Sequence, residues 1–126
     1  MIKFIDNYFS TSDERGSFIG LINFGEWKEF NLIKSDSGVF RGGHYHRTTL
    51  EGFVILEGKI SVSVQKVSGG RGIGDKSIYE VKEGDVFIID PMVYHEFEIK
   101  KQSIWINFLS DAMDQSMPDI HNLKKI

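Results

Sequence analysis

Short segments rich in isoleucine, valine and phenylalanine follow one another along most of this chain, and glycine or charged residues separate them. Residues 60–65, Ile-Ser-Val-Ser-Val-Gln, alternate apolar and polar side chains, as a strand with one buried face does. Helical periodicity is nearly absent. Strand signals at spacings of about 8 to 12 residues, with turns between them, predict an all-β domain built as an antiparallel sandwich or barrel.

A chain of 126 residues has the size of one domain, so residues 1–126 are expected to form a single one. Glycine tolerates the positive φ of tight turns, so Gly58 and Gly84 are expected to mark hairpin turns. After Leu109 the chain becomes polar, which predicts a short helical or irregular tail. The predicted strands span residues 18–23, 30–34, 39–47, 53–56, 59–67, 77–81, 85–89, 94–100 and 104–109.

Charge and composition exclude several classes of function. A net charge of −3 provides no basic stripe for a phosphodiester backbone, so nucleic acid is not an expected partner. The absence of cysteine excludes disulfides and thiol chemistry. The first residues lack a secretory signal, and no apolar run approaches the roughly 18 residues of a membrane span. A cytoplasmic protein without a membrane partner is therefore expected.

Three of the four histidines lie in two glycine-framed motifs, Gly-x5-His-x-His-x4-Glu-x6-Gly and Gly-x10-His. Alternate residues of a strand point to the same face, so His44 and His46 are expected to share one wall of the sheet. Together with Glu51 and His95 they are capable of forming a site for iron, manganese, nickel or zinc. Without a metal, the same imidazoles would be acid–base groups that titrate near neutrality.

The two histidine motifs resemble those of the cupin barrel. Three segments are also similar to motifs of enzymes that act on nucleotide-linked 4-keto-6-deoxysugars, the dTDP-4-dehydrorhamnose 3,5-epimerases and the sugar 3,4-ketoisomerases. They are Asp13-Glu14-Arg15-Gly16, Arg41-Gly42-Gly43-His44-Tyr45-His46 and Pro91-Met92-Val93-Tyr94-His95-Glu96. The resemblance implies a cupin jelly-roll barrel, a homodimer, and an isomerase of bacterial surface-polysaccharide (O-antigen, lipopolysaccharide) synthesis. It also implies that no metal or other cofactor takes part.

In the chemistry that the resemblance implies, the 4-keto group of the sugar acidifies C3, and a base removes the C3 proton to leave an enolate on O4. His44 is the expected base. Lys34, His46 or His95 would stabilise the enolate oxygen. The acid that returns a proton to the opposite face of C3 is not identified by any motif, and Tyr94 and His95 are the candidates.

Further residues are assigned to substrate binding. By resemblance, Arg15 and Arg41 contact the pyrophosphate and nearby sugar, which suits guanidinium groups, although Arg15 is alternatively a solvated turn charge. Trp105 and Phe18 are each expected either to stack on the base or sugar or to pack in the core, and packing in the core is preferred for Phe18. Glu51 stands where ketoisomerases are expected to carry glutamine, and this departure keeps the metal alternative open.

Residues 30–34 lack the tyrosine that ketoisomerases carry before the Arg-Gly turn, so C3 epimerisation is preferred to ketoisomerisation. The ketoisomerase, a metal-dependent cupin enzyme and a non-catalytic module that binds a sugar nucleotide remain as alternatives. The apolar residues within 18–22 predict a strand that pairs with a second sheet in a dimer. The nucleotide, dTDP, CDP or another, and inversion at C5 are left open.

Overall fold

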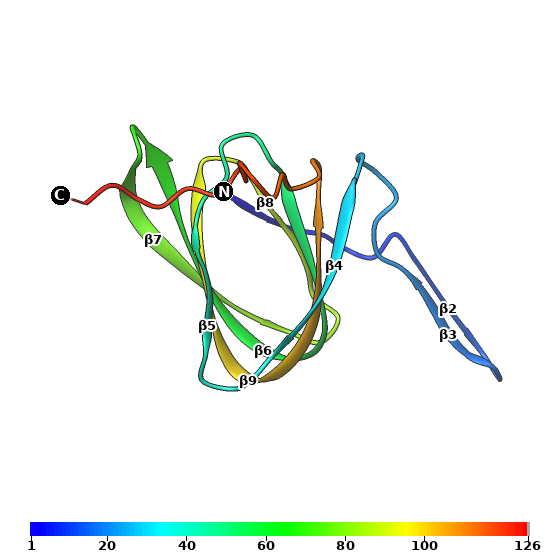
Figure 1. The fold of residues 1–126 in the computed structure, drawn as a ribbon. Helices are drawn as coiled ribbons and strands as arrows, with labels where there is room; N and C mark the ends of the chain where they lie inside the picture. The colour runs from blue at the N-terminus through cyan, green and yellow to red at the C-terminus, as the bar shows by residue number, and fades with distance from the viewer. Residues whose placement is uncertain (126) are drawn as a thin grey trace.

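The computed structural model describes residues 1–125, which form a barrel of antiparallel strands with a two-stranded hairpin beside it (Figure 1). The predicted all-β fold class is confirmed, and no helix forms among these residues. No helix in the same range has the length and apolar character needed to cross a membrane. The strands are β1 (Ile2–Phe4), β2 (Phe9–Asp13), β3 (Gly16–Gly20), β4 (Glu29–Ser35), β5 (Phe40–His44), β6 (Glu51–Ser68), β7 (Arg71–Lys82), β8 (Val86–Ile89) and β9 (Val93–Leu109).

The two longest strands, β6 and β9, organise the barrel. They pair antiparallel from Glu51 with Leu109 at one end to Lys66 with Val93 at the other. β8 and then β1 extend the sheet from β6, β7 also pairs with β6, and β4 and β5 both pair with β9. Figure 1 shows β6 and β9 curving from one wall of the barrel to the other, so each strand contributes side chains to both walls.

The hairpin turn predicted at Gly58 is wrong, because β6 runs through it. Gly58 has a φ of 111°, and a Cβ there would lie 2.7 Å from the Cα of Ser103. The register of β6 against β9 shifts on both sides of this glycine. Glycine here serves a bulge that bends a continuous strand. Likewise, the separately predicted strands 94–100 and 104–109 are one strand, β9.

Other local predictions have mixed outcomes. The turn at Gly84 is confirmed, and the Lys82 N–H donates to Asp85 Oδ2 across it at 2.8 Å. The short strands β1 and β2 were not predicted, and β3 ends at Gly20 rather than at residue 23. The tail after Leu109 is irregular, which was one of the two predicted alternatives.

Apolar side chains fill the interior of the barrel. Val62 and Val64 of β6 are fully buried, which confirms the buried face predicted from their alternation. Trp105 is 1% exposed, so it packs in the core, as one of its two predicted roles required. Their neighbours in this core are Phe53, Ile55, Ile60, Val81, Phe87, Ile89, Val93, Phe97 and Ile99. This close-packed interior holds rigidly the strands that carry the polar site described below.

The hairpin of β2 and β3 projects from the barrel (Figure 1). Phe18 in β3 is 67% exposed, so its predicted place in the core is wrong. The reason is that β2 and β3 pair with each other as a separate two-stranded sheet and do not join the main one. Such a hairpin alone is only marginally stable in water.

Candidate active site

Four polar side chains converge within the barrel. His44 ends β5, His46 follows two residues later, Glu51 begins β6 and His95 lies in β9. His44 and His95 are direct partners in the β5–β9 pairing. One nitrogen or carboxylate oxygen from each of the four lies within 4.8 Å of those of the others. The structure thus brings together the whole set that the two sequence motifs single out.

Glu51 lies at the centre of this cluster and is 6% exposed. Its Oε1 is 2.8 Å from Nε2 of His46 and 3.3 Å from Nε2 of His95. Its Oε2 accepts a hydrogen bond of 2.8 Å from Nδ2 of Asn107. Both carboxylate oxygens are therefore paired, as a buried charge requires.

The outer ring nitrogens of two imidazoles face backbone carbonyls. Nδ1 of His46 donates to the carbonyl of Asp119 at 2.6 Å, and Nδ1 of His95 donates to the carbonyl of Val93 at 3.0 Å. Because a carbonyl only accepts hydrogen bonds, the network assigns a proton to each Nδ1. Nε2 of both rings is consequently the atom that faces Glu51.

Burial and neighbouring charges set the protonation states of the cluster. Burial, reinforced by repulsion from His95 and His46, lowers the pKa of His44 to about 4. Burial also acts to lower the pKa of His46, but the hydrogen bond and charge of Glu51 outweigh it and the pKa is raised. Burial acts to raise the pKa of Glu51, but the hydrogen bonds from His46 and His95 lower it. A neutral His44 therefore lies beside an ionised Glu51–His46 pair.

The same four residues fit a divalent metal ion. They offer three imidazole nitrogens and one carboxylate oxygen, a set that suits zinc, iron, manganese or nickel. Nε2 of His95 is buried and lacks a well-directed hydrogen-bond partner among the described residues. The backbone carbonyls on the outer nitrogens of His46 and His95 are the usual support of metal-ligating imidazoles. The geometry therefore fits the metal alternative as well as the metal-free chemistry that the resemblance implies.

A cavity of about 180 Å³ opens beside the cluster. Arg41 of β5 lines it, with Nε donating to Oγ of Ser35 at 3.1 Å and Nη2 donating to the carbonyl of Lys34 at 3.2 Å. Nε1 of Trp105 donates to the same Ser35 hydroxyl at 3.1 Å. Arg41 is exposed and Trp105 is buried, so the guanidinium marks the open side of the cavity and the indole its inner wall.

Besides His46, which is buried within the cluster, three residues that the sequence assigned to the site do not line this cavity. Arg15 lies at the turn of the projecting hairpin, where it pairs with Asp13. Lys34 is exposed, because it alternates along β4 with two residues that face inward. Tyr94 alternates with the buried His95 along β9 and so points away from the cluster. A substrate in this cavity is therefore not within reach of these three side chains of the same copy.

Two residues of the site were missed by the sequence reasoning. Asn107 binds Glu51 and lines the cavity, and its Oδ1 is buried without a hydrogen-bond partner among the described residues. Strand alternation could have identified it, because it lies two residues after Trp105 on the predicted strand 104–109. Asp119 lies in the tail, 73 residues from the histidine it contacts, and no local pattern signals such a contact.

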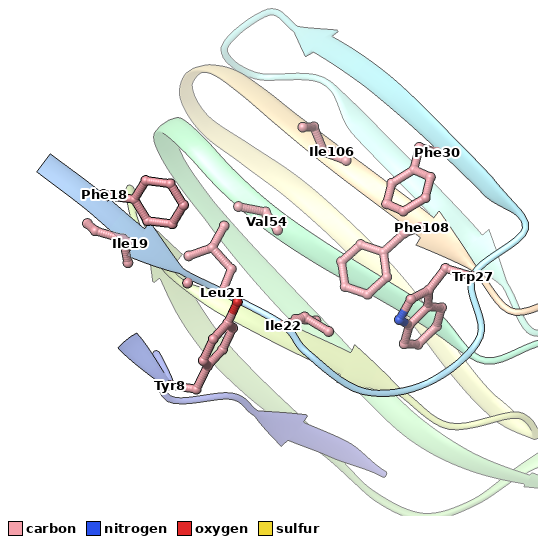
Figure 2. Close-up of a pocket in the computed structure, with 11 residues that line it drawn as sticks. Tyr8, Phe18, Ile19, Leu21, Ile22, Trp27, Phe30, Val54, Ile106 and Phe108 are labelled. Atoms are coloured by element: carbon pink, nitrogen blue, oxygen red, sulfur yellow. The ribbon is translucent and has the colours of Figure 1, made fainter. Parts of the chain in front are cut away.

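A second hollow lies between the hairpin and the outer face of the barrel (Figure 2). Its volume is about 460 Å³, and its lining is almost entirely apolar. Figure 2 shows Phe18 and Tyr8 on the hairpin side and Phe30, Phe108 and Trp27 on the barrel side. This groove carries none of the polar groups of the histidine cluster.

Part of this chain is similar in sequence to a known protein. UDP-2-acetamido-2,6-beta-L-arabino-hexul-4-ose reductase of Pseudomonas aeruginosa is 30% identical to this chain over 59 residues. The match covers 47% of this chain and 16% of that protein, so this chain corresponds to a small part of the curated relative.

Solved structures share the fold. The TDP-quinovose 3,4-ketoisomerase WlaRB of Campylobacter jejuni has a TM-score of 0.78 and 18% identity, covering 96% of this chain and 92% of that one. The capsular polysaccharide assembling protein CapF of Staphylococcus aureus has a TM-score of 0.70 and 23% identity, covering 93% of this chain and 34% of that one. These likenesses confirm the cupin-type barrel. A family model described as the polysaccharide biosynthesis C-terminal domain matches residues 11–120, and the chain belongs to this family.

Proposed function

We propose that this chain epimerises C3 of a nucleotide-linked 4-keto-6-deoxyhexose in the synthesis of a bacterial surface polysaccharide. The observation that carries the proposal is the buried cluster in which a neutral His44 lies beside the ionised Glu51–His46 pair. Membership of a polysaccharide biosynthesis family supports the setting. The name of the curated relative denotes a UDP-linked hexul-4-ose, which carries the ketone at C4 that such chemistry needs.

Removal of the C3 proton is the first step. The neutral imidazole of His44 takes this proton, and the electrons move through the C3–C4 bond to leave an enolate on O4. Because the pKa of His44 is only about 4, the transfer requires strong stabilisation of the enolate. His46 supplies it as a buried cation whose pKa is raised by Glu51, since a fixed positive charge stabilises an oxyanion strongly in a water-poor site.

Epimerisation requires that a proton return to the opposite face of C3. Neither candidate acid reaches that face, because Tyr94 points away from the cluster and His95 lies beside His44, with ring centroids 4.9 Å apart. In the proposal, solvent water at the open side of the cavity therefore returns the proton. Arg41, exposed at the open side of the cavity, suits the pyrophosphate of the nucleotide. Trp105 forms the wall against which the sugar would lie, and Ile33, the residue of β4 that lines the cavity, offers no phenol for ketoisomerisation.

A second candidate mechanism for the same reaction class uses a divalent metal ion, which the convergence of four donor atoms favours. The ion would be held by His44, His46, Glu51 and His95. Such an ion would act as a Lewis acid toward the C4 ketone. His44 would then be a ligand, and Asn107 would orient Glu51 through its 2.8 Å hydrogen bond. In the first mechanism the imidazoles alone supply the positive charge that stabilises the enolate. In the second, a metal ion would supply part of that charge.

We also propose that the chain is a homodimer in which the hairpin of one copy packs into the apolar groove of the other. Both halves of the contact belong to the same chain, so a two-fold arrangement satisfies both at once. The exposed apolar side chains here amount to roughly 700 Å² per copy, near the ~800 Å² per partner of a stable interface. They are Tyr8, Phe9, Phe18, Ile19, Phe30 and Leu32.

Light scattering tests the dimer. The wild-type chain should have twice the monomer mass of 14.4 kDa, and Phe18→Asp should be monomeric. Ile78→Asp is the matched control, because Ile78 is also 67% exposed but lies on β7, away from the hairpin. A monomeric wild type, or a Phe18→Asp protein that remains dimeric, would contradict this assignment.

The experiment that tests the activity uses UDP-linked and dTDP-linked 4-keto-6-deoxyhexoses in D2O, followed by proton NMR. The enzyme should exchange the C3 proton of at least one of them for deuterium. His44→Asn should lower this exchange about 100-fold or more, and Glu57→Gln, an exposed change on β6, should leave it unaffected. Tight binding of the sugar nucleotides without exchange would instead identify a binding module.

A further inference from the structure

The C-terminal tail crosses the loop that separates two members of the histidine cluster. Residues 47–50 join His46 to Glu51, and Asp119 from the tail lies directly over this loop. Nothing in the two histidine motifs points to Asp119, because the tail follows the last strand of the barrel. Its contacts nevertheless determine how the loop, and therefore His46, is held.

The carboxylate of Asp119 accepts five hydrogen bonds from the loop. Three come from consecutive backbone N–H groups, those of Arg47 at 2.8 Å, Thr48 at 3.0 Å and Thr49 at 3.0 Å. Two come from hydroxyl groups, those of Thr48 at 3.1 Å and Thr49 at 2.8 Å. Successive backbone amides that point at one anion form a well-defined concave site, so this carboxylate fixes the path of the loop.

The backbone of the same tail segment contacts the cluster itself. The carbonyl of Asp119 accepts the 2.6 Å hydrogen bond from Nδ1 of His46. Two residues on, His121 pairs with Tyr45 through both backbone groups, at 3.0 and 2.9 Å, and its Nε2 lies 2.8 Å from Oδ1 of Asp119. The tail is thus held by the side chain of Asp119 and, two residues further on, by His121.

We propose that Asp119 is a positioning residue, which fixes His46 with a proton on Nδ1 and with Nε2 facing Glu51. A ring held in this way presents a defined nitrogen to a reacting oxygen or a metal ion. The catalytic consequence rests on the proposed function, but the proton on Nδ1 and the orientation of the ring do not. The comparable support of His95 comes from Val93 within its own strand, so His46 is the member of the pair that depends on the tail.

Nitrogen-15 NMR of histidine-labelled protein tests the assignment in the full chain. Nδ1 of His46 should be protonated in the wild type, and exchange of its proton with solvent should be slow. In Asp119→Ala, exchange should accelerate about 10-fold or more, or the protonated Nδ1 signal should be lost, in line with the usual effect of removing such support. Thr49→Val removes one donor to the carboxylate and keeps a similar shape, so it should give a smaller change even if Asp119→Ala folds poorly.

Asp114→Ala is the matched control. Asp114 lies in the same tail, and its carboxylate accepts hydrogen bonds from Ser116 and Met117 of that tail. This variant should leave the His46 signal unchanged. If Asp119→Ala and Thr49→Val both retain the wild-type Nδ1 signal and exchange rate, the positioning role is overturned, whatever their melting temperatures.

Kinetics separate this role from the proposed function. If the chain is an epimerase, Asp119→Ala should lower kcat by about 10-fold or more with little change in KM, because the substrate does not touch Asp119. If the wild type is inactive on every sugar nucleotide while the NMR results are as expected, the proposed function fails and the positioning role is supported. A normal kcat in Asp119→Ala together with an unchanged Nδ1 signal contradicts the positioning role alone.

Discussion

Replacement of Glu51 by glutamine tests whether the centre of the cluster is an ion pair. The carboxylate binds His46 and Asn107 at 2.8 Å each and approaches His95 at 3.3 Å. Nε2 of the cationic His46 and Nδ2 of Asn107 both donate to it, so an amide must turn its NH2 group toward one of these two donors. The loss of a hydrogen bond to a charged group costs about 1.5–3 kcal/mol, and the lower cost of burying a neutral amide offsets part of it.

The expected net effect of Glu51→Gln is a loss of about 2 kcal/mol in the free energy of unfolding, or roughly 6–10 °C in Tm for a chain of this size. Urea and thermal unfolding at pH 7, with EDTA present so that no metal contributes, measure it. Glu57→Gln is the control, since it removes the same charge from an exposed position on the same strand. Unchanged or greater stability in Glu51→Gln would show that the Glu51–His46 pair is not ionised and would refute the reasoning.

Three further predictions concern the base, the tail and the metal. His44→Asn should lower kcat about 100-fold or more while the nucleotide still binds, and near-wild-type turnover would exclude His44 from catalysis. Hydrogen bonds from the loop lower the pKa of Asp119 below its ordinary 3.8 despite the opposing effect of burial, so its stabilisation is present above that value and is lost as pH falls. The stability difference between wild type and Asp119→Asn should therefore shrink from pH 5 to pH 3, and a constant difference would contradict this. Dialysis against EDTA should abolish activity, and one divalent ion should restore it, if the four-residue set is a metal site; full activity after dialysis would support proton transfer by the imidazoles alone.

The polar site could be predicted from the sequence because the alternation of side chains along a strand depends only on neighbouring residues. Alternation directs His44 and His46 to one wall, and the pairing of β5 with β9 brings His95 directly beside His44. The error at Gly58 has a physical cause, because glycine serves a turn or a bulge equally well. Only the pairing partner decides which of the two forms, and the partner strand begins at Val93, far along the chain.

Contacts between distant segments explain the remaining differences. Lys34 and Tyr94 were chosen as candidates for their chemistry, yet each alternates with an inward-facing residue and so points outward. Phe18 has the apolar character of a core residue, but its strand pairs within a separate hairpin. Asp119 contacts the loop after His46 through a tail that has no periodic pattern, so nothing in the local sequence could indicate it.

The position of the ketone in the product tests the central proposal most directly. A nucleotide-linked 4-keto-6-deoxyglucose is incubated with the enzyme in D2O, and the product is identified by carbon and proton NMR. Epimerisation predicts deuterium at C3, inverted configuration there, and a carbonyl that remains at C4. A carbonyl found at C3, with deuterium delivered to C4, would contradict the epimerase and identify the chain as a 3,4-ketoisomerase.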